Sequence, residues 1–172
     1  MDNLLEYVLA VLSTTPERWQ RLVGTLPVDL LSRPPAPGQW SALNCLQHLV
    51  DAERLVFPVR FQAFLAGQDF TDFNPNQPHG SESLTPEELI ADFTRHRQES
   101  LAQLRQVKDE DLNRTLQHPR FGRVTLGEML HTWAGHDLMH TVQAERALMQ
   151  PFMLGSGPWR VFFQDHEISV PE

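Results

Sequence analysis

Two histidines, His136 and His140, have the spacing that allows two side chains to act on one ligand. In a helix, residues four positions apart lie about 40° apart on the same face, one turn from each other. This spacing lets two imidazoles bind a single metal ion. His131 lies about 180° from His140 on the same helix and cannot join the pair. The pair alone is weak evidence for a metal site, so the residues on the same helix face must also be considered.

The surroundings place both histidines on the core-facing side of their helix. Steps of three and four residues connect Met129, Trp133, His136, His140, Gln143 and Ala147. A similar row on an earlier helix connects Cys45, His48, Ala52, Leu55 and Val59. Three inward histidines from two helices can meet in a bundle core, where metal sites are commonly built. The alternative is that each histidine is a core residue with its own hydrogen-bond partner.

A set of three histidine ligands has a definite chemistry. Neutral imidazoles suit Zn, Ni, Fe or Co. Three protein ligands leave at least one coordination position for water or substrate, as catalytic sites do. A divalent ion can lower the pKa of its bound water to about 7, and it can equally hold a thiol as thiolate. We therefore expect one divalent ion, whose identity the ligand set does not define.

The elements that must position these histidines are amphipathic helices, and they predict an all-α four-helix bundle. Apolar stripes over residues 5–12 and 19–26 indicate a first helix. Thr15-Pro16 has the form of a new helix start, so this helix is either kinked near Thr14 or split in two. A proline-rich loop follows over residues 27–38.

The second helix, which carries His48, is predicted over residues 42–65. Ser41 can cap its start. Pro58 should bend it about one turn earlier, and Gly67 should end it. Loop-forming residues then fill positions 68–84.

The third and fourth helices both begin with a capping box. Thr85-Pro86-Glu87-Glu88 starts the third helix, and Thr125-Leu126-Gly127-Glu128 starts the fourth, which runs to about Met149. Residues 108–124 between them are polar and form a short turn or a hairpin. We divide the chain into a bundle over residues 1–150 and an irregular tail over 151–172.

The tail carries the aromatic residues Trp159, Phe162 and Phe163. Large apolar side chains in a segment of this kind need a surface to cover. We expect them to pack on the bundle or on a partner.

Composition excludes several classes of function. The chain has 172 residues and a formal net charge of −8, and an acidic surface repels nucleic acid. The single cysteine, Cys45, cannot form an intrachain disulfide and suits a reducing compartment. It is either a fourth metal ligand or a small buried residue. The chain lacks a signal-peptide pattern and a membrane-spanning apolar run, so we expect a soluble, cytoplasmic protein.

Two motifs resemble those of DinB-like proteins. Pro37-Gly38-Gln39-Trp40-Ser41-Ala42, followed by Leu46-Gln47-His48-Leu49-Val50-Asp51-Ala52-Glu53, is similar to the opening signature of that family. Thr125-Leu126-Gly127-Glu128-Met129-Leu130, then His136-Asp137-Leu138-Met139-His140-Thr141-Val142-Gln143, is similar to its last core helix. The resemblance covers about residues 1–150. This family is distinct from the polymerase that shares its name.

The resemblance implies an up-down-down-up bundle, often a homodimer, with a divalent metal on three histidines. By motif position these are His48, His136 and His140. Members of the family include transferases and isomerases that use low-molecular-weight thiols such as bacillithiol or mycothiol as co-substrate. Others are described as metal-dependent hydrolases of small molecules. The resemblance thus implies a thiol S-transferase or a related hydrolase.

Other polar residues close to these positions are candidates for catalytic roles. Glu53 is a candidate base, although a salt bridge to Arg97 or Arg60 is the simpler account. Arg97 itself could meet an anionic substrate. Asp137 either orients a ligand histidine or pairs with a surface arginine. Gln143 either faces the pocket beside the metal site or is simply the polar end of the core-facing row that contains His136 and His140.

Three functions compete on this evidence. The first is a metal-dependent enzyme, a thiol S-transferase or hydrolase. The second is a stress-associated metal-binding protein without turnover, in which a side chain or the tail blocks the open coordination position. The third is a structural bundle without metal. Metal content separates the third from the others.

Overall fold

Four helical rods make up the body of the protein in its computed structural model, which describes residues 3–70 and 79–168. The rods are α1 (Leu4–Thr25), α3 (Ala42–Leu55) continued by α4 (Phe57–Ala66), α5 (Pro86–Leu104) and α6 (Leu126–Gly155). The predicted four-helix bundle is therefore confirmed. Residues 71–78 of the predicted loop and residues 169–172 of the predicted tail lie outside the described part. None of the described helices is long and apolar enough to span a bilayer.

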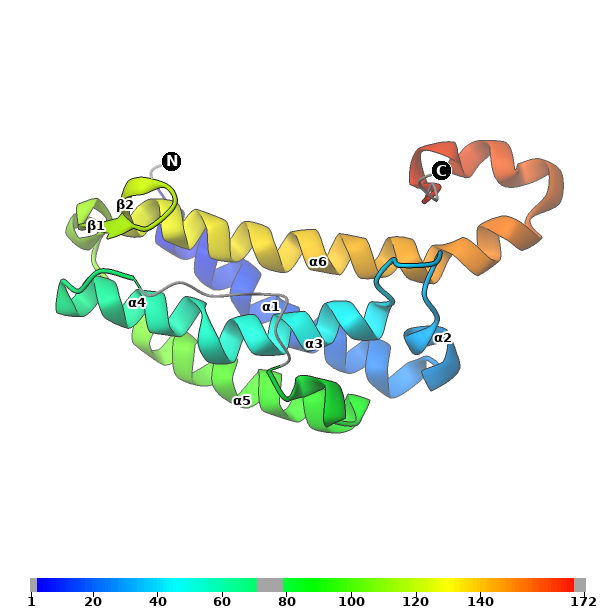
Figure 1. The fold of residues 1–172 in the computed structure, drawn as a ribbon, viewed down its shortest axis with the longest axis horizontal. Coiled ribbons are helices and arrows are strands. Elements are labelled where there is room, and N and C mark those ends of the chain that lie inside the picture. The colour runs from blue at the N-terminus through cyan, green and yellow to red at the C-terminus, as the bar shows by residue number, and fades with distance from the viewer. Residues whose placement is uncertain (1–2, 71–78, 169–172) are drawn as a thin grey trace.

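The rods have the up-down-down-up order. Figure 1 shows α1 and α6 running in one direction, with α3–α4 and α5 running in the other. Helix α1 packs against α5 and α6, and α3 packs against the same two helices. Helices α3 and α5 run the same way, and a short 3-10 helix, η1 (Ser81–Ser83), precedes α5.

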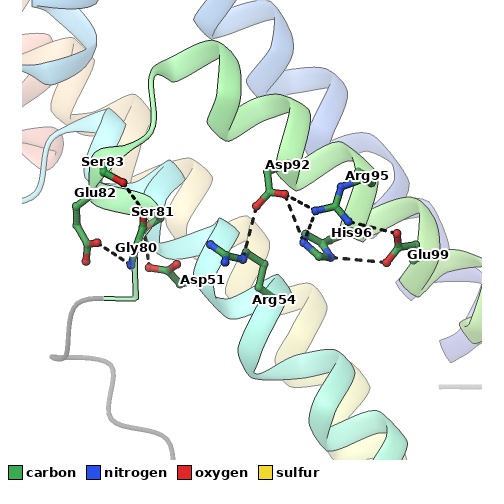
Figure 2. A network of polar contacts seen from close by, with 10 residues as sticks. All are labelled: Asp51, Arg54, Gly80, Ser81, Glu82, Ser83, Asp92, Arg95, His96 and Glu99. Atoms are coloured by element: carbon green, nitrogen blue, oxygen red, sulfur yellow. Dashed lines mark hydrogen bonds and ion pairs between the residues drawn. The ribbon is translucent and has the colours of Figure 1, made fainter.

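Polar contacts connect η1 and α5 to α3, as Figure 2 shows. The Ser81 hydroxyl donates to Asp51 Oδ2 on α3 at 2.7 Å. Further along the chain, Asp92 on α5 lies 3.6 Å from Arg54 Nε on α3. The first contact ties the helix that carries His48 to η1, and the second ties it to α5.

Helix α1 is one continuous helix, so of the two alternatives for this segment, a kink or a split, the split is wrong. Pro16 has no N–H to donate to the carbonyl of Leu12, four residues earlier. That carbonyl instead accepts a hydrogen bond of 2.9 Å from Arg97 Nη1 on α5. The Thr15 hydroxyl donates to the carbonyl of Val11 at 3.1 Å. Side-chain hydrogen bonds therefore replace the missing backbone hydrogen bond, and the helix continues past Pro16.

The second rod breaks where a bend was expected. Val56 leaves helical geometry between α3 and α4, and Pro58 lies in the first turn of α4. Gly67 ends α4 in the left-handed conformation with a φ of 66°. The break also corrects the predicted core row, because Leu55 and Val59 beside it are exposed.

Helix starts follow the predicted chemistry. Thr85 and Thr125 each form a capping box with the glutamate three residues later. Ser41 forms the same arrangement with Asn44. These caps fix where α3, α5 and α6 begin, and hence the register of the residues that the helices present to the core.

The connections contain more regular structure than predicted. A short helix, α2 (Val28–Ser32), lies within the predicted proline-rich loop. Between α5 and α6, a 3-10 helix, η2 (Asp109–Asn113), precedes a hairpin of β1 (Thr115–His118) and β2 (Gly122–Thr125). The two strands are antiparallel, with Thr115 opposite Thr125. Of the two alternatives for this segment, a hairpin is the one found.

The predicted irregular tail is wrong in its form. Helix α6 continues through Pro151 to Gly155, and a 3-10 helix, η3 (Gly157–His166), follows it. The predicted boundary between bundle and tail at residue 150 thus falls inside a helix. That residues 1–150 form a domain separate from the tail stays a prediction. Trp159 and Phe162 do not pack on the bundle, because they are 65% and 76% exposed.

Candidate metal centre

The three predicted histidines come together near the middle of the bundle. His48 on α3 and His136 on α6 approach with their Nε2 atoms 3.0 Å apart. The His140 ring centroid lies 4.5 Å from that of His48 and 4.4 Å from that of His136. One ring nitrogen from each of the three lies within 4.8 Å of the others. The helical periodicity therefore identified side chains that are neighbours in space.

The distances fit a shared ion. Nitrogen ligands bind Zn at about 2.0–2.1 Å, so two of them on one ion lie about 2.9–3.4 Å apart in octahedral or tetrahedral geometry. The 3.0 Å between His48 and His136 falls in this range. Each neutral imidazole also offers one nitrogen lone pair. The residues present therefore fit a divalent ion.

The rings are neutral at ordinary pH. Burial lowers the pKa of His48 to about 4, with a further contribution from His140. Burial lowers the pKa of His136 to about 3, assisted by His140, His48 and Arg97. The pKa of His140 is also lowered by burial. Because only the neutral ring binds a metal, no proton has to be displaced at neutral pH.

Gln143 fixes the orientation of one ring. His140 Nδ1 lies 2.9 Å from Gln143 Oε1. An amide oxygen only accepts, so Nδ1 carries the proton and donates it, and Nε2 keeps its lone pair for an ion. Of the two alternatives for Gln143, contact with the histidine site is the one found.

Aromatic side chains surround the rings, and the sequence patterns did not single them out. Trp40 lies 5.0 Å from His48 and stacks on His140 at 5.7 Å between centroids. Phe57 lies 5.1 Å from His136, whose Nδ1 is buried without a hydrogen-bond partner among the described residues. Trp40 precedes the cap of α3 and Phe57 follows its break, so no helical period places either residue. The signal available for Trp40 was its place in the first motif.

Arg97 is not available to a substrate, which corrects its predicted role. The side chain is 1% exposed. Its Nη1 donates to Asp137 Oδ2 at 2.6 Å, and its Nε donates to Glu53 Oε2 at 3.0 Å. With the bond to the Leu12 carbonyl, one guanidinium on α5 connects α1, α3 and α6. The salt bridge between Glu53 and Arg97 is the simpler account given above for Glu53.

In this buried cluster, one guanidinium lies between two carboxylates, those of Glu53 and Asp137. Burial alone would lower the pKa of Arg97, but Asp137 and Glu53 raise it on balance, so the guanidinium stays charged. Burial raises the pKa of Glu53, and Arg97 opposes that change.

Asp137 and Cys45 are both buried, one in an ion pair with Arg97 and the other in the hydrophobic core. Both carboxylate oxygens of Asp137 accept hydrogen bonds from Arg97, so its partner is a buried arginine rather than a surface one. Cys45 is fully buried and free, and burial raises the pKa of its thiol to about 12. It is not part of the ligand cluster in the described residues, which supports the packing interpretation.

Comparisons with known proteins agree with this geometry. The sequence pattern of the DinB superfamily matches residues 12–144, a span that includes all three histidines. The structure of YfiT from Bacillus subtilis, described as a probable metal-dependent hydrolase with an unusual four-helix bundle topology, superposes with a TM-score of 0.75 at 19% identity. The match covers 86% of this chain and 87% of YfiT.

A second solved structure has the same kind of fold. TT2238, a four-helix bundle protein, superposes with a TM-score of 0.57 at 20% identity, covering 79% of this chain and 94% of TT2238. A comparison with curated proteins finds no match. The structural likenesses establish the fold, and the sequence pattern establishes the family. The chain belongs to the DinB superfamily.

Proposed function

We propose that this chain is a divalent-metal-dependent enzyme that acts on a small molecule, with His48, His136 and His140 as the metal ligands. The observation that supports this best is the convergence of one nitrogen from each ring within 4.8 Å. Zn, Ni, Fe or Co would suit three imidazoles. Bound there, the ion would supply a Lewis acid and hold a water or a thiol in its deprotonated form.

Thiol S-transfer is the reaction that the surrounding residues support best. The two buried carboxylates close to the histidines, Glu53 and Asp137, are both held by Arg97. Neither is free to act as a general base, which hydrolysis needs more than thiol transfer does. We therefore propose a low-molecular-weight thiol, such as bacillithiol or mycothiol, as co-substrate. Metal-dependent hydrolysis is the second candidate, because YfiT is described as a probable hydrolase.

A metal-binding protein without turnover is the alternative. It would require a side chain or the tail to block the remaining coordination position. Trp40, which contacts two of the three rings, is the side chain closest to such a role. Its indole is 38% exposed. Catalysis with the metal-loaded protein separates this alternative from the enzyme.

Metal content is the first test. Protein purified without a histidine tag is expected to hold one divalent ion per chain by elemental analysis. Replacing His48, His136 or His140 by alanine should abolish this binding. His131, an exposed histidine on the same helix α6, provides the matched control, and His131→Ala should keep the metal. A metal-free wild type, or equal loss in the control, would contradict the site.

Activity is the second test. The metal-loaded protein is incubated with an aryl halide electrophile and bacillithiol, mycothiol or glutathione, and loss of free thiol is measured. A parallel assay uses a nitrophenyl ester without thiol. Thiol consumption that His140→Ala abolishes supports transfer, and ester cleavage with the same dependence supports hydrolysis. Metal binding without either reaction favours the alternative.

We also propose that the protein is a cytoplasmic homodimer. The exposed aromatic residues of η3, Trp159 and Phe162, support a partner surface on the tail. The formal charge of −8 argues against nucleic acid as that partner.

A further inference from the structure

A pocket lies between α6 and the end of the tail, outside the histidine cluster. It has a volume of about 650 Å³, and its walls include Gln39, Leu138, Met139, Val142, Arg146 and Ile168. Figure 1 shows η3 turning back over α6, and residues 166–168, at and just after its end, hydrogen-bond to side chains of that helix. The pocket thus lies on a face of α6 that the bundle leaves open, where Leu138, Met139 and Val142 are exposed.

Hydrogen bonds hold the tail in this position. The Gln150 side chain donates to the carbonyl of His166 at 3.0 Å and accepts from the Ile168 N–H at 3.3 Å. Arg146 Nη2 donates to the carbonyl of Glu167 at 3.3 Å. Three contacts from one face of α6 therefore define the wall of the pocket.

The pocket adjoins the histidine site. Gln143, whose oxygen accepts the His140 Nδ1 proton, is also part of the pocket wall. Gln39, also in the pocket wall, directly precedes Trp40, which stacks on His140. A molecule in the pocket would therefore lie beside the ring of one proposed ligand.

The pocket combines apolar walls with one available cation. Leu138, Met139, Val142 and Ile168 supply the apolar surface. Arg146 has no carboxylate within 4.0 Å among the described residues, and the side chain of Glu167 is paired with Arg160 at 2.7 Å. The carbonyl of Glu167 is neutral, so within residues 3–70 and 79–168 no contact compensates the guanidinium charge. An unpaired arginine in an apolar recess suits the planar carboxylate of an organic acid.

We propose that this pocket binds a small organic monocarboxylate, with its apolar body against α6 and its carboxylate on Arg146. A single guanidinium in a protein with a net charge of −8 favours a monoanion over a phosphate dianion. That the pocket is the substrate subsite of the metal centre rests on the function proposed above. The binding itself does not depend on that function.

The test uses hexanoate and 1-hexanol as probes on the full chain labelled with ¹³C at the methionine methyl groups. Met139 lies in this pocket, and Met129 lies in a separate small pocket beside the hairpin. Hexanoate should shift the Met139 signal, identified with Met139→Leu, and leave that of Met129 in place. Wild type should bind hexanoate about tenfold more tightly than 1-hexanol, since a charge-assisted hydrogen bond is lost with the alcohol.

Two variants locate the charge. Arg146→Gln should weaken hexanoate binding about tenfold and remove the preference over 1-hexanol. Arg21→Gln, at an exposed arginine of α1, should change neither. The preference of wild type for the acid tests the proposal even if Arg146→Gln fails to fold. An unmoved Met139 signal, or equal affinities for acid and alcohol in wild type, would overturn it.

The titrations are run with the protein as purified and again after metal removal by a chelator. If Arg146→Gln weakens hexanoate binding both with and without the metal, the result supports binding in the pocket. Binding that requires the metal and ignores Arg146→Gln would show that hexanoate sits on the ion, which overturns the proposal. If the protein holds no metal at all, the proposed function fails, while the Met139 and Arg146 results still decide whether the pocket binds a carboxylate.

Discussion

The hydrogen bond from His140 to Gln143 determines which nitrogen of that ring faces the other two histidines. With the Nδ1 proton held by Gln143 Oε1 at 2.9 Å, the ring presents its Nε2 lone pair. Outer partners of this kind are typically worth about 10- to 100-fold in metal affinity. The amide of Gln143 is therefore expected to act on metal binding without touching the ion.

Gln143→Leu is expected to weaken metal binding about tenfold or more, because the ring loses the acceptor that sets its tautomer. Competition with a chelating dye measures the affinity. The control is Gln98→Leu, at an exposed glutamine of α5, which should bind as wild type does. An affinity in Gln143→Leu equal to that of the control would remove Gln143 from the site.

The lowered pKa values of the histidines give the metal-free protein a defined pH dependence. The pKa is about 4 for His48 and about 3 for His136, against 6.5 when unfolded. Between about pH 4 and 6.5 the unfolded chain therefore binds protons that the folded chain does not, and protonation favours unfolding. The stability from the neutral rings is fully present above about pH 6.5 and decreases as the pH falls.

With a chelator present, the urea midpoint should fall between pH 7 and pH 5, and it should fall less in His136→Gln, which cannot bind that proton. His131→Gln, at the exposed histidine of α6, should keep the wild-type slope. Identical slopes in all three proteins would mean that the buried rings do not titrate as described.

Much of the site at residue scale could be predicted. Helical period alone selected His48, His136 and His140, because core positions in helices repeat regularly. It could not identify Trp40, which lies just before the cap of α3, or Phe57, which is the first residue of α4. It offered both a substrate contact for Arg97 and a salt bridge from Glu53 to Arg97 or Arg60, and it could not decide between them, because the second carboxylate, that of Asp137, comes from another helix.

At the scale of elements, Arg97 is the point where the four rods meet. Pro16 removes an N–H from α1, and the carbonyl thus freed, that of Leu12, accepts from Arg97. The carboxylates of Glu53 on α3 and Asp137 on α6 form ion pairs with the same guanidinium. Since His48 is five residues before Glu53 and His136 directly precedes Asp137, the same contacts set the register between the helices that carry the histidines.

Arg97→Met should lower the free energy of unfolding by about 3–5 kcal/mol, because it leaves two buried carboxylates without their cation. Urea unfolding with chelator present measures this. Arg95→Met is the matched control on the same helix, since Arg95 is 57% exposed and surface ion pairs contribute about 0–1 kcal/mol. Equal losses in the two variants would show that the buried cluster does not hold the bundle together.

Helix starts could be read from the sequence better than helix continuity. Capping boxes at Thr85 and Thr125 act locally, so they could be predicted. Whether a helix survives its proline depends on what replaces the lost hydrogen bond. For Pro16 the replacement comes from α5, 85 residues away in sequence from Leu12. Local patterns do not contain that information, and the same limit applies to Pro151 in α6.

At the scale of the whole molecule, α6 and η3 extend beyond the bundle and carry apolar residues into solvent (Figure 1). Trp159 and Phe162 are exposed on η3, and large exposed apolar patches mark interaction surfaces. The amphipathic periods predicted the bundle, which closes on its own core. They could not predict how the tail is arranged, because the residues at and after the end of η3 are held by polar side chains of α6, such as Gln150, and not by an apolar stripe.

The proposed homodimer gives this surface a function that can be measured. Light scattering on wild type should give the mass of two chains, and Phe162→Asp should shift the protein to one chain, because an aromatic anchor at an interface is typically worth about 2 kcal/mol or more. Phe121→Asp changes a phenylalanine on the hairpin that is 67% exposed, close to the 76% of Phe162. It should leave the mass unchanged. A single-chain mass for wild type would rule out the dimer, and equal dissociation by both variants would place the interface elsewhere than on η3.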